Sequence, residues 1–254
     1  VYREQPTVTV TANDDSKVYD GAAYSGGNGV TYAGFVNNDT SAGLGGVLAY
    51  GGTSQGAVNA GGYTIVPSGL SSGLGYNLSF ANGTLTINPA ALALSVTAQD
   101  AAKTYGTQLN FTGTEFTSVG LQGGDTIGSV TLTSVGAPAS APVGSYSIIP
   151  SNATGGTFNP ANYNISYVNG VLTVNPAALT ITVANAVKTY GQTATFAGTE
   201  FTSSGLQNSE TIGSVALTSQ GSRATASVAD GPYAIVASDA GGGTFNPANY
   251  NISY

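Results

Sequence analysis

The sequence of 254 residues contains no cysteine, histidine, methionine or tryptophan. Without histidine and cysteine it can form neither a Ser-His-Asp triad nor a cysteine nucleophile. The usual protein ligands of zinc, haem and iron–sulfur clusters are missing for the same reason. The absence of cysteine also excludes disulfide bonds, so packing and backbone pairing must hold each domain together. We therefore expect no enzyme and no cofactor.

Charged residues are scarce as well. Asp, Glu, Lys and Arg make up 7% of the chain, against about 25% in an ordinary soluble domain. Five basic residues and a net charge of −7 exclude a basic surface for nucleic acid or for an anionic membrane. No apolar run reaches the length of about 18 residues that a membrane-spanning helix needs. No signal peptide opens the chain, so we expect a piece of a longer protein.

What the chain does contain favours β-structure. Apolar residues amount to 41%, and there are 37 Gly and 15 Tyr, which is unlike the composition of a disordered chain. Val, Thr and Tyr are frequent in strands, whereas Gly and Asn are frequent in tight turns. Strong helix formers such as Lys, Glu and Met are few, so we expect an all-β protein.

Three motifs recur along the chain at spacings of 85 to 87 residues. The first runs from a lysine to a glycine through a tyrosine, the second is glycine-rich and ends in an acid and a threonine, and the third begins Tyr-Asn. Their copies are Lys17–Gly21, Lys103–Gly106 and Lys188–Gly191; Gly34–Thr40, Gly120–Thr126 and Gly205–Thr211; and Tyr76–Phe80, Tyr163–Tyr167 and Tyr250–Tyr254. One coil of a β-solenoid takes only about 20–29 residues, so this period predicts tandem domains.

These spacings divide the chain into three domains, residues 1–89, 90–176 and 177–254. We expect each to be a small β-sandwich or a β-grasp-like domain, and we expect the third to lack its last strand. The joints carry Pro89 and Pro176 directly between strands, without a flexible spacer. Because proline fixes φ and stiffens a joint, the three domains are expected to form an elongated rod.

Period-two alternation identifies strands within the domains. Residues 7–12, 94–98 and 179–183 alternate apolar and polar side chains, which predicts strands with one buried face. Asn82-Gly83 and Asn169-Gly170 each lie between two alternating runs, and Asn-Gly is the typical pair of a type I′ turn. We therefore expect the last two strands of a domain to form a β-hairpin.

Together these motifs resemble the YDG and MBG (mostly beta, glycine-rich) repeats of large bacterial surface proteins. Residues 17–21, Lys-Val-Tyr-Asp-Gly, resemble the YDG type, whereas Lys-Thr-Tyr-Gly at residues 103–106 and 188–191 resembles the MBG type. Such repeats occur in filamentous-haemagglutinin-like exoproteins exported by two-partner secretion and in other adhesins. The resemblance implies an extracellular or cell-surface stalk or spacer, and it supplies no catalytic residues.

The repeated lysine is the best candidate for chemistry. Glu115 follows Lys103 by twelve residues, and Glu200 follows Lys188 at the same distance. A lysine near an asparagine and an acid can form an internal isopeptide cross-link, as in some surface adhesins. A cross-strand Lys–Glu ion pair is the commoner outcome. The first domain has Gly29 in place of the glutamate, which favours the ion pair.

Acidic and aromatic side chains offer two weaker candidates. The densest group of acids is Asp14, Asp15, Asp20 and Asp39. These acids are too scattered for the 6–8 oxygen ligands of calcium, and their places in turns explain them without a metal. The tyrosines could stack on sugars, but alternating tyrosines usually pack a core or cover a sheet.

We interpret the chain as a structural stalk or spacer of a secreted or cell-surface bacterial adhesin that presents a distal binding region. The segment is expected to be monomeric, without a metal or a nucleic-acid partner. Host or matrix glycans or proteins would be bound by other parts of the full-length chain. The main alternative is a carbohydrate-binding module that uses exposed Tyr and Asn, and an enzyme is a distant third.

Overall fold

The structure is a computed structural model that describes residues 3–254. These residues form nineteen β-strands and four short 3₁₀ turns, without an α-helix. The turns are η1 (Ser41–Gly43), η2 (Pro160–Asn162), η3 (Gln220–Ser222) and η4 (Pro247–Asn249). The expected all-β fold is confirmed. Within the described residues, no helix has the length and hydropathy needed to cross a membrane.

The chain divides into two compact units. The first unit comprises the residues up to 97 together with 116–131 and 151–168, and the second comprises 98–115, 132–150 and 169–254. The first unit therefore contains the first repeat and part of the second. The rest of the second repeat and the third repeat form the second unit.

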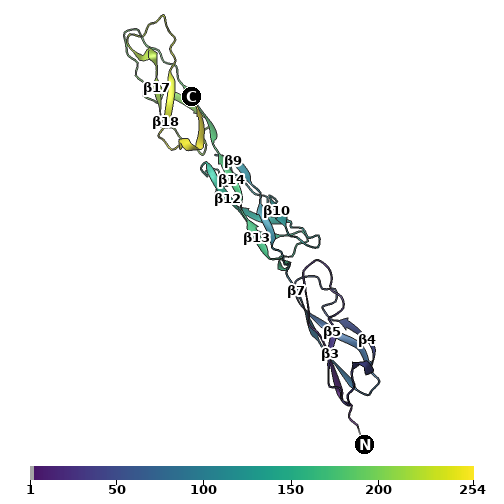
Figure 1. Cartoon of the computed structure of the whole chain (residues 1–254). Coiled ribbons are helices and arrows are strands. Elements are labelled where there is room, and N and C mark those ends of the chain that lie inside the picture. The colour runs from purple at the N-terminus through teal and green to yellow at the C-terminus, as the bar shows by residue number, and fades with distance from the viewer. Residues whose placement is uncertain (1–2) are drawn as a thin grey trace. The chain divides into compact units, whose positions relative to one another are not determined.

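The first unit is built from three small sheets (Figure 1). One three-stranded sheet has the order β3 (Val30–Ala33), β1 (Thr7–Ala12) and β6 (Asn77–Ala81). The four-stranded sheet has the order β2 (Asp15–Val18), β7 (Gly83–Asn88), β5 (Gly61–Ser72) and β4 (Leu44–Gly51). The third has the order β10 (Phe116–Val119), β8 (Leu94–Ala98) and β13 (Ile165–Val168).

The second unit holds most of another four-stranded sheet, in which Figure 1 shows β12, β14 and β9 side by side. Its order is β11 (Ser129–Thr133), β12 (Gly144–Thr154), β14 (Gly170–Asn175) and β9 (Ala101–Thr104). A three-stranded sheet has the order β16 (Phe201–Ser204), β15 (Ala177–Val183) and β19 (Tyr250–Ser253). The last sheet contains only β17 (Ser214–Thr218) and β18 (Val236–Gly241).

The expected alternation along the first strand of each repeat is confirmed. In β1 the side chains of Val8 and Val10 are completely buried, and Thr9 between them is partly exposed. β8 buries Leu94 and Val96 in the same way, and β15 buries Leu179 and Ile181. These aliphatic side chains form the centre of the cores. Burying each of them stabilises the fold by about 1.5–3 kcal/mol.

The expected hairpins at Asn82-Gly83 and Asn169-Gly170 are wrong. β6 pairs in parallel with β1, whereas β7 pairs with β5 and β2 in another sheet. β13 and β14 likewise belong to different sheets. A Cβ on Gly83 would lie 2.6 Å from the carbonyl oxygen of Ala12, so this glycine permits a close backbone approach. Each Asn-Gly pair thus marks the place where the chain passes from one sheet to another.

The joints between repeats are short and hydrogen-bonded. Only Pro176 separates β14 from β15. At the other joint, the N–H of Ala90, next to Pro89, donates to the carbonyl oxygen of Asn162 at 2.8 Å. The two prolines therefore lie where sequence analysis expected them, at strand ends that need no backbone donor.

Candidate functional site

A tyrosine–carboxylate cluster joins the first repeat to the second within the first unit. We call Tyr19, Asp125 and Tyr163 the first junction. Both tyrosine hydroxyls donate to Oδ2 of Asp125, from Tyr19 at 2.9 Å and from Tyr163 at 2.7 Å. The two rings meet edge to face, with centroids 5.5 Å apart, which is a favourable aromatic geometry. One carboxylate therefore holds a tyrosine from each repeat.

A buried asparagine adds a second contact to the first junction. Asn162 is 1% exposed and lies at the end of η2, where the side chain of Asn159 accepts a hydrogen bond from the N–H of Ala161. Oδ1 of Asn162 accepts from the N–H of Ala60 at 2.7 Å, and Nδ2 of Asn162 donates to Oδ1 of Asn59 at 3.0 Å. The side-chain amide thus binds a loop of the first repeat.

Two glycines allow the backbones of the two repeats to touch at this junction. A Cβ on Gly21 would lie 2.4 Å from Cα of Gly123. Gly21 has φ +78° and Gly123 has φ +61°, a region that glycine adopts without steric cost. The glycines of the first and second sequence motifs are therefore required by the contact between repeats.

The second junction, Tyr105, Glu210 and Tyr250, joins the second repeat to the third within the second unit. Tyr105 donates to Oε1 of Glu210 at 2.7 Å, and Tyr250 donates to Oε2 of the same carboxylate. The rings of the two tyrosines again meet edge to face at 5.5 Å. Oδ1 of Asn249 accepts from the N–H of Val143 at 3.0 Å. The arrangement of the first junction is thus repeated with Glu in place of Asp.

Burial and the carboxylates raise the pKa values of the junction tyrosines. Burial is the larger cause and the hydrogen bond to the carboxylate the second, because both disfavour a tyrosinate. The pKa of Tyr250 rises to about 12, and those of Tyr19, Tyr105 and Tyr163 also lie above their usual value. All four tyrosines therefore act as neutral donors, so the junctions are suited to holding repeats together.

The junctions are assembled from the same three motifs that recur in the sequence. A family model for the MBG domain of the YGX type matches residues 8–86, 94–173 and 179–254. The chain belongs to this MBG family. The same model matches all three repeats, including the first, whose residues 17–21 resemble the YDG type. MBG repeats fit a repeat region of a surface protein, and the family is not enzymatic. No curated protein matches the chain.

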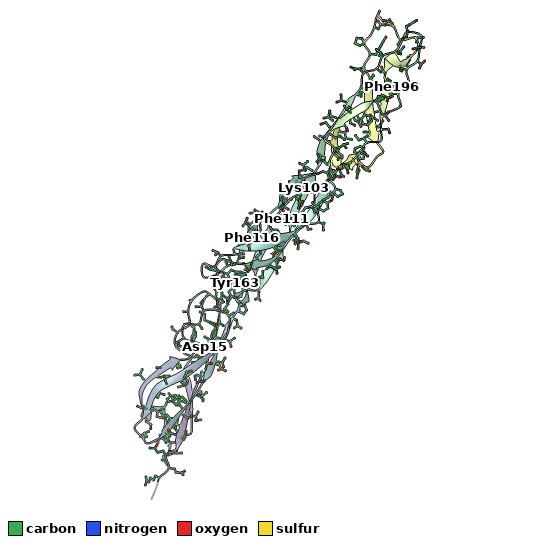
Figure 2. All side chains as sticks on the ribbon, turned by 180° about the vertical axis from the view of Figure 1, so that it is seen from behind. Asp15, Lys103, Phe111, Phe116, Tyr163 and Phe196 are labelled. Atoms are coloured by element: carbon green, nitrogen blue, oxygen red, sulfur yellow. The ribbon has the colours of Figure 1, made fainter. Side chains whose placement is uncertain are left out.

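The lysines and glutamates singled out from the sequence lie apart in the MBG repeats. Lys103, labelled in Figure 2, is 8% exposed and donates to the carbonyl oxygens of Thr107 at 2.9 Å, Ala137 at 3.2 Å and Pro138. Lys188 donates to the carbonyl oxygen of Gln192 at 3.1 Å. Burial lowers the pKa of Lys103, while the carbonyl dipoles stabilise its charge.

Glu115 and Glu200 each close a tight turn with their own carboxylate. Glu115 accepts from the N–H groups of the three residues before it, with the nearest oxygens at 2.9, 2.9 and 3.1 Å. Glu200 likewise accepts hydrogen bonds from the N–H groups of the three residues before it, at 2.9, 2.9 and 3.1 Å. Hydrogen bonds from these backbone N–H groups lower the pKa of Glu115 to about 2, and the bond from Thr112 is the largest cause. Among residues 3–254, the expected Lys–Glu ion pairs do not form; the one salt bridge joins Lys17 to Asp20 at 2.7 Å.

The acids of the first repeat also have separate partners. Oδ1 of Asp14 accepts from the N–H of Thr84 at 2.7 Å, and Oδ2 of Asp15 accepts from the hydroxyl of Tyr24 at 2.7 Å. Asp39 accepts from the hydroxyl of Tyr76 at 2.7 Å. Within the described residues, no three acidic side chains gather as ligands for a metal ion.

The sequence alone does not mark the acids and asparagines of the junctions as functional residues. Asp125 and Glu210 belong to the recurring glycine-rich motif, whereas Asn162 and Asn249 lie just before the third motif. The feature of the sequence that points to the junction residues is the equal spacing of the three motifs. Motifs that recur with one period can meet between consecutive repeats, and here the first motif of one repeat contacts the second and third motifs of the next.

Proposed function

We propose that this chain is a structural stalk or spacer of a secreted or cell-surface bacterial adhesin and that it presents a distal binding region. The observation that carries the proposal is the repeated junction, in which one carboxylate and one buried asparagine bind the neighbouring repeat. Such contacts fix the angle between consecutive repeats, which a stalk requires and a flexible linker does not supply. Membership of the MBG family supports the same role.

The proposed stalk consists of three modules, residues 1–89, 90–176 and 177–254, arranged as a monomeric, elongated rod. The modules need no disulfide bonds, since the sequence contains no cysteine. The low charge of the chain gives a neutral polar surface that suits export in an unfolded state. Ligand binding to host or matrix glycans or proteins is then assigned to other parts of the full-length protein.

Small-angle X-ray scattering tests the shape on which this function depends. A compact globule of this length has a radius of gyration of about 18 Å. Three domains end to end form a rod on the order of 100 Å, given strands of about 3.4 Å per residue, and the radius of gyration is then about 29 Å. We expect the larger value and a monomeric mass. A value near 18 Å would contradict the stalk.

The alternative of a carbohydrate-binding module has less support. That module would use exposed Tyr and Asn, yet the recurring tyrosines Tyr76, Tyr163 and Tyr250 are only 5–7% exposed. Their hydroxyls bind Asp39, Asp125 and Glu210. Aromatic rings that stack on sugars must present an open face, so these three do not form such a platform.

A further inference from the structure

Two tyrosines from neighbouring repeats lie against each other in each junction. The rings of Tyr19 and Tyr163 have centroids 5.5 Å apart and an interplanar angle of 72°. Those of Tyr105 and Tyr250 have centroids 5.5 Å apart and an angle of 81°. All four tyrosines are buried, and Tyr163 is labelled in Figure 2. The same pairing of two phenols therefore occurs twice, at equivalent places in the repeats.

The carboxylate of each junction brings the two hydroxyl groups together. Oδ2 of Asp125 accepts from Tyr19 at 2.9 Å and from Tyr163 at 2.7 Å, so both hydroxyl oxygens lie next to one atom. Glu210 accepts from its two tyrosines through its two oxygens. The ortho carbons of a phenol are bonded to the carbon that carries the hydroxyl, so these carbons converge as well. They are the atoms at which two tyrosyl radicals couple.

The same carboxylate is placed to accept the proton that an oxidised tyrosine releases. A tyrosine that loses an electron becomes a strong acid, and each junction phenol already donates its hydrogen bond to a carboxylate. Phe158 packs on Tyr163 and Phe245 packs on Tyr250, with ring centroids 5.4 and 5.7 Å apart. A tyrosyl radical therefore forms here without leaving an unpaired positive charge in the buried site, which would be costly.

The composition of the chain directs oxidation to tyrosine. Cysteine and methionine, whose sulfur atoms are the usual targets of oxidants, are absent, and so are tryptophan and histidine. The 15 tyrosines are therefore the most easily oxidised side chains of the protein. Because no disulfide bond can form, a covalent link between repeats that is made by oxidation has to join two tyrosines.

We propose that the tyrosine pair of each junction is the site of an oxidative cross-link that joins consecutive repeats covalently. A peroxide is the oxidant: each phenol loses one electron and one proton, and the two radicals form a bond between their ortho carbons. The hydrogen on each of these carbons then moves as a proton to the phenol oxygen, which restores both hydroxyls. The chain has lost two hydrogen atoms, which reduce one hydrogen peroxide to two water molecules. This inference goes beyond the stalk function and does not depend on it.

The first repeat contains a natural control with a single phenol. Tyr76 donates to Oδ2 of Asp39 at 2.7 Å, as the junction tyrosines do to their carboxylates. The ring of Tyr76 meets that of Phe35 edge to face, with centroids 5.5 Å apart. Phenylalanine has no hydroxyl and forms no phenoxyl radical, so Tyr76 has the geometry of a junction without a coupling partner. We therefore expect Tyr76 to form no cross-link within the folded chain.

The test oxidises the folded 254-residue chain with peroxodisulfate, a peroxide that light and tris(bipyridyl)ruthenium(II) convert into small one-electron oxidants. Size-exclusion chromatography then isolates the monomer, which removes links between chains. We expect the intact mass, unchanged before oxidation, to fall by two hydrogen atoms for each cross-link. Peptide mass spectrometry should join Tyr19 to Tyr163 and Tyr105 to Tyr250, and the fluorescence of dityrosine gives a second readout.

Matched variants separate the junction geometry from chance encounters of radicals. Tyr163→Phe reproduces the arrangement of Tyr76 and Phe35, so it should abolish the first cross-link and leave the second, which also reports that the variant is folded. Asp125→Asn keeps the shape of the carboxylate but is a far weaker proton acceptor, so the yield of the first cross-link should fall relative to the second. Tyr190→Phe, at an exposed tyrosine, should change neither.

Three results would overturn the proposal. The first is that neither pair is linked in the oxidised monomer. The second is that other tyrosine pairs, including pairs with Tyr76, are linked as often as the two junction pairs. The third is that unfolding in urea before oxidation leaves the pattern of links unchanged, since the preference for the junction pairs should disappear when the repeats no longer hold the rings together.

Discussion

At the scale of the residue, one carboxylate in each junction binds a tyrosine from both repeats. Asp125 accepts two tyrosine hydroxyls through a single oxygen, and Glu210 accepts two through both of its oxygens. Hydrogen bonds to a charged acceptor contribute about 1.5–3 kcal/mol each. A short acid in the glycine-rich motif is thus enough to bind a tyrosine of the preceding repeat.

Replacing the carboxylate of the first junction should destabilise the protein. Asp125→Ala leaves the hydroxyls of Tyr19 and Tyr163 without their acceptor, so we expect the free energy of unfolding to fall by about 2–3 kcal/mol. Urea unfolding followed by circular dichroism measures the change. Asp230→Ala, at an exposed acid, is the control and should be neutral. Equal stabilities of the two variants would show that the junction contributes nothing.

The junction tyrosines should also make stability fall at alkaline pH. In the folded chain the pKa of Tyr250 is raised to about 12 from its usual 10. Between these values the unfolded chain loses the proton while the folded chain keeps it, so ionisation favours unfolding as pH rises. Stability contributed by this group is therefore complete below about pH 10 and is lost towards pH 12.

Denaturant unfolding between pH 9 and pH 12 checks this dependence. Tyr250→Phe should flatten the decline, because it removes the titrating hydroxyl. Tyr190→Phe, at a tyrosine that is 63% exposed, should leave the decline as in the unchanged protein. If the Tyr250→Phe variant followed the same pH profile as the other two proteins, the assignment of the decline to this junction would be wrong.

At the scale of the element, close backbone approach rather than turn conformation explains the Asn-Gly pairs. We expect Gly83→Ala to lower the free energy of unfolding by about 1–3 kcal/mol, the usual cost of an overpacked site. The added Cβ would lie 2.6 Å from the carbonyl oxygen of Ala12, so the strand would have to move.

Gly62→Ala is the matched control for this prediction, since Gly62 lies in β5 of the same sheet and has open space at the Cβ position. It should be neutral or slightly stabilising, because alanine restricts the unfolded chain. Thermal unfolding of both variants measures the difference. If the Gly83→Ala variant were as stable as the Gly62→Ala variant, the site between Gly83 and Ala12 would have room for a side chain and the prediction would be wrong.

At the scale of the whole molecule, the chain should contain no covalent cross-link. The amine of Lys103 is bound by carbonyl oxygens, and the carboxylate of Glu115 is bound by backbone N–H groups. The amine is therefore not placed to attack an asparagine amide, and the carboxylate is not placed to assist such an attack. We expect the intact mass to equal the mass calculated from the sequence. Mass spectrometry checks this, and a deficit of one ammonia would reveal a Lys–Asn bond.

The sequence by itself determined the all-β fold, the three repeats and the first strand of each. These features follow from local rules: composition, the equal spacing of motifs, and the alternation that buries Val8 and Val10 in β1. It also placed Pro89 and Pro176 at strand ends, because proline has no N–H to give to a sheet.

Only the tertiary structure decided which strands pair and what the motifs bind. Asn82-Gly83 has the local signature of a hairpin, yet β6 and β7 find better partners in separate sheets, and a local rule contains no information about these distant strands. The partner of Lys103 could not be read from its spacing to Glu115, since a carboxylate can bind backbone N–H groups equally well, as that of Glu115 does. The junctions depend on side chains about 100 residues apart, as in Tyr19 and Asp125, which only folding brings together.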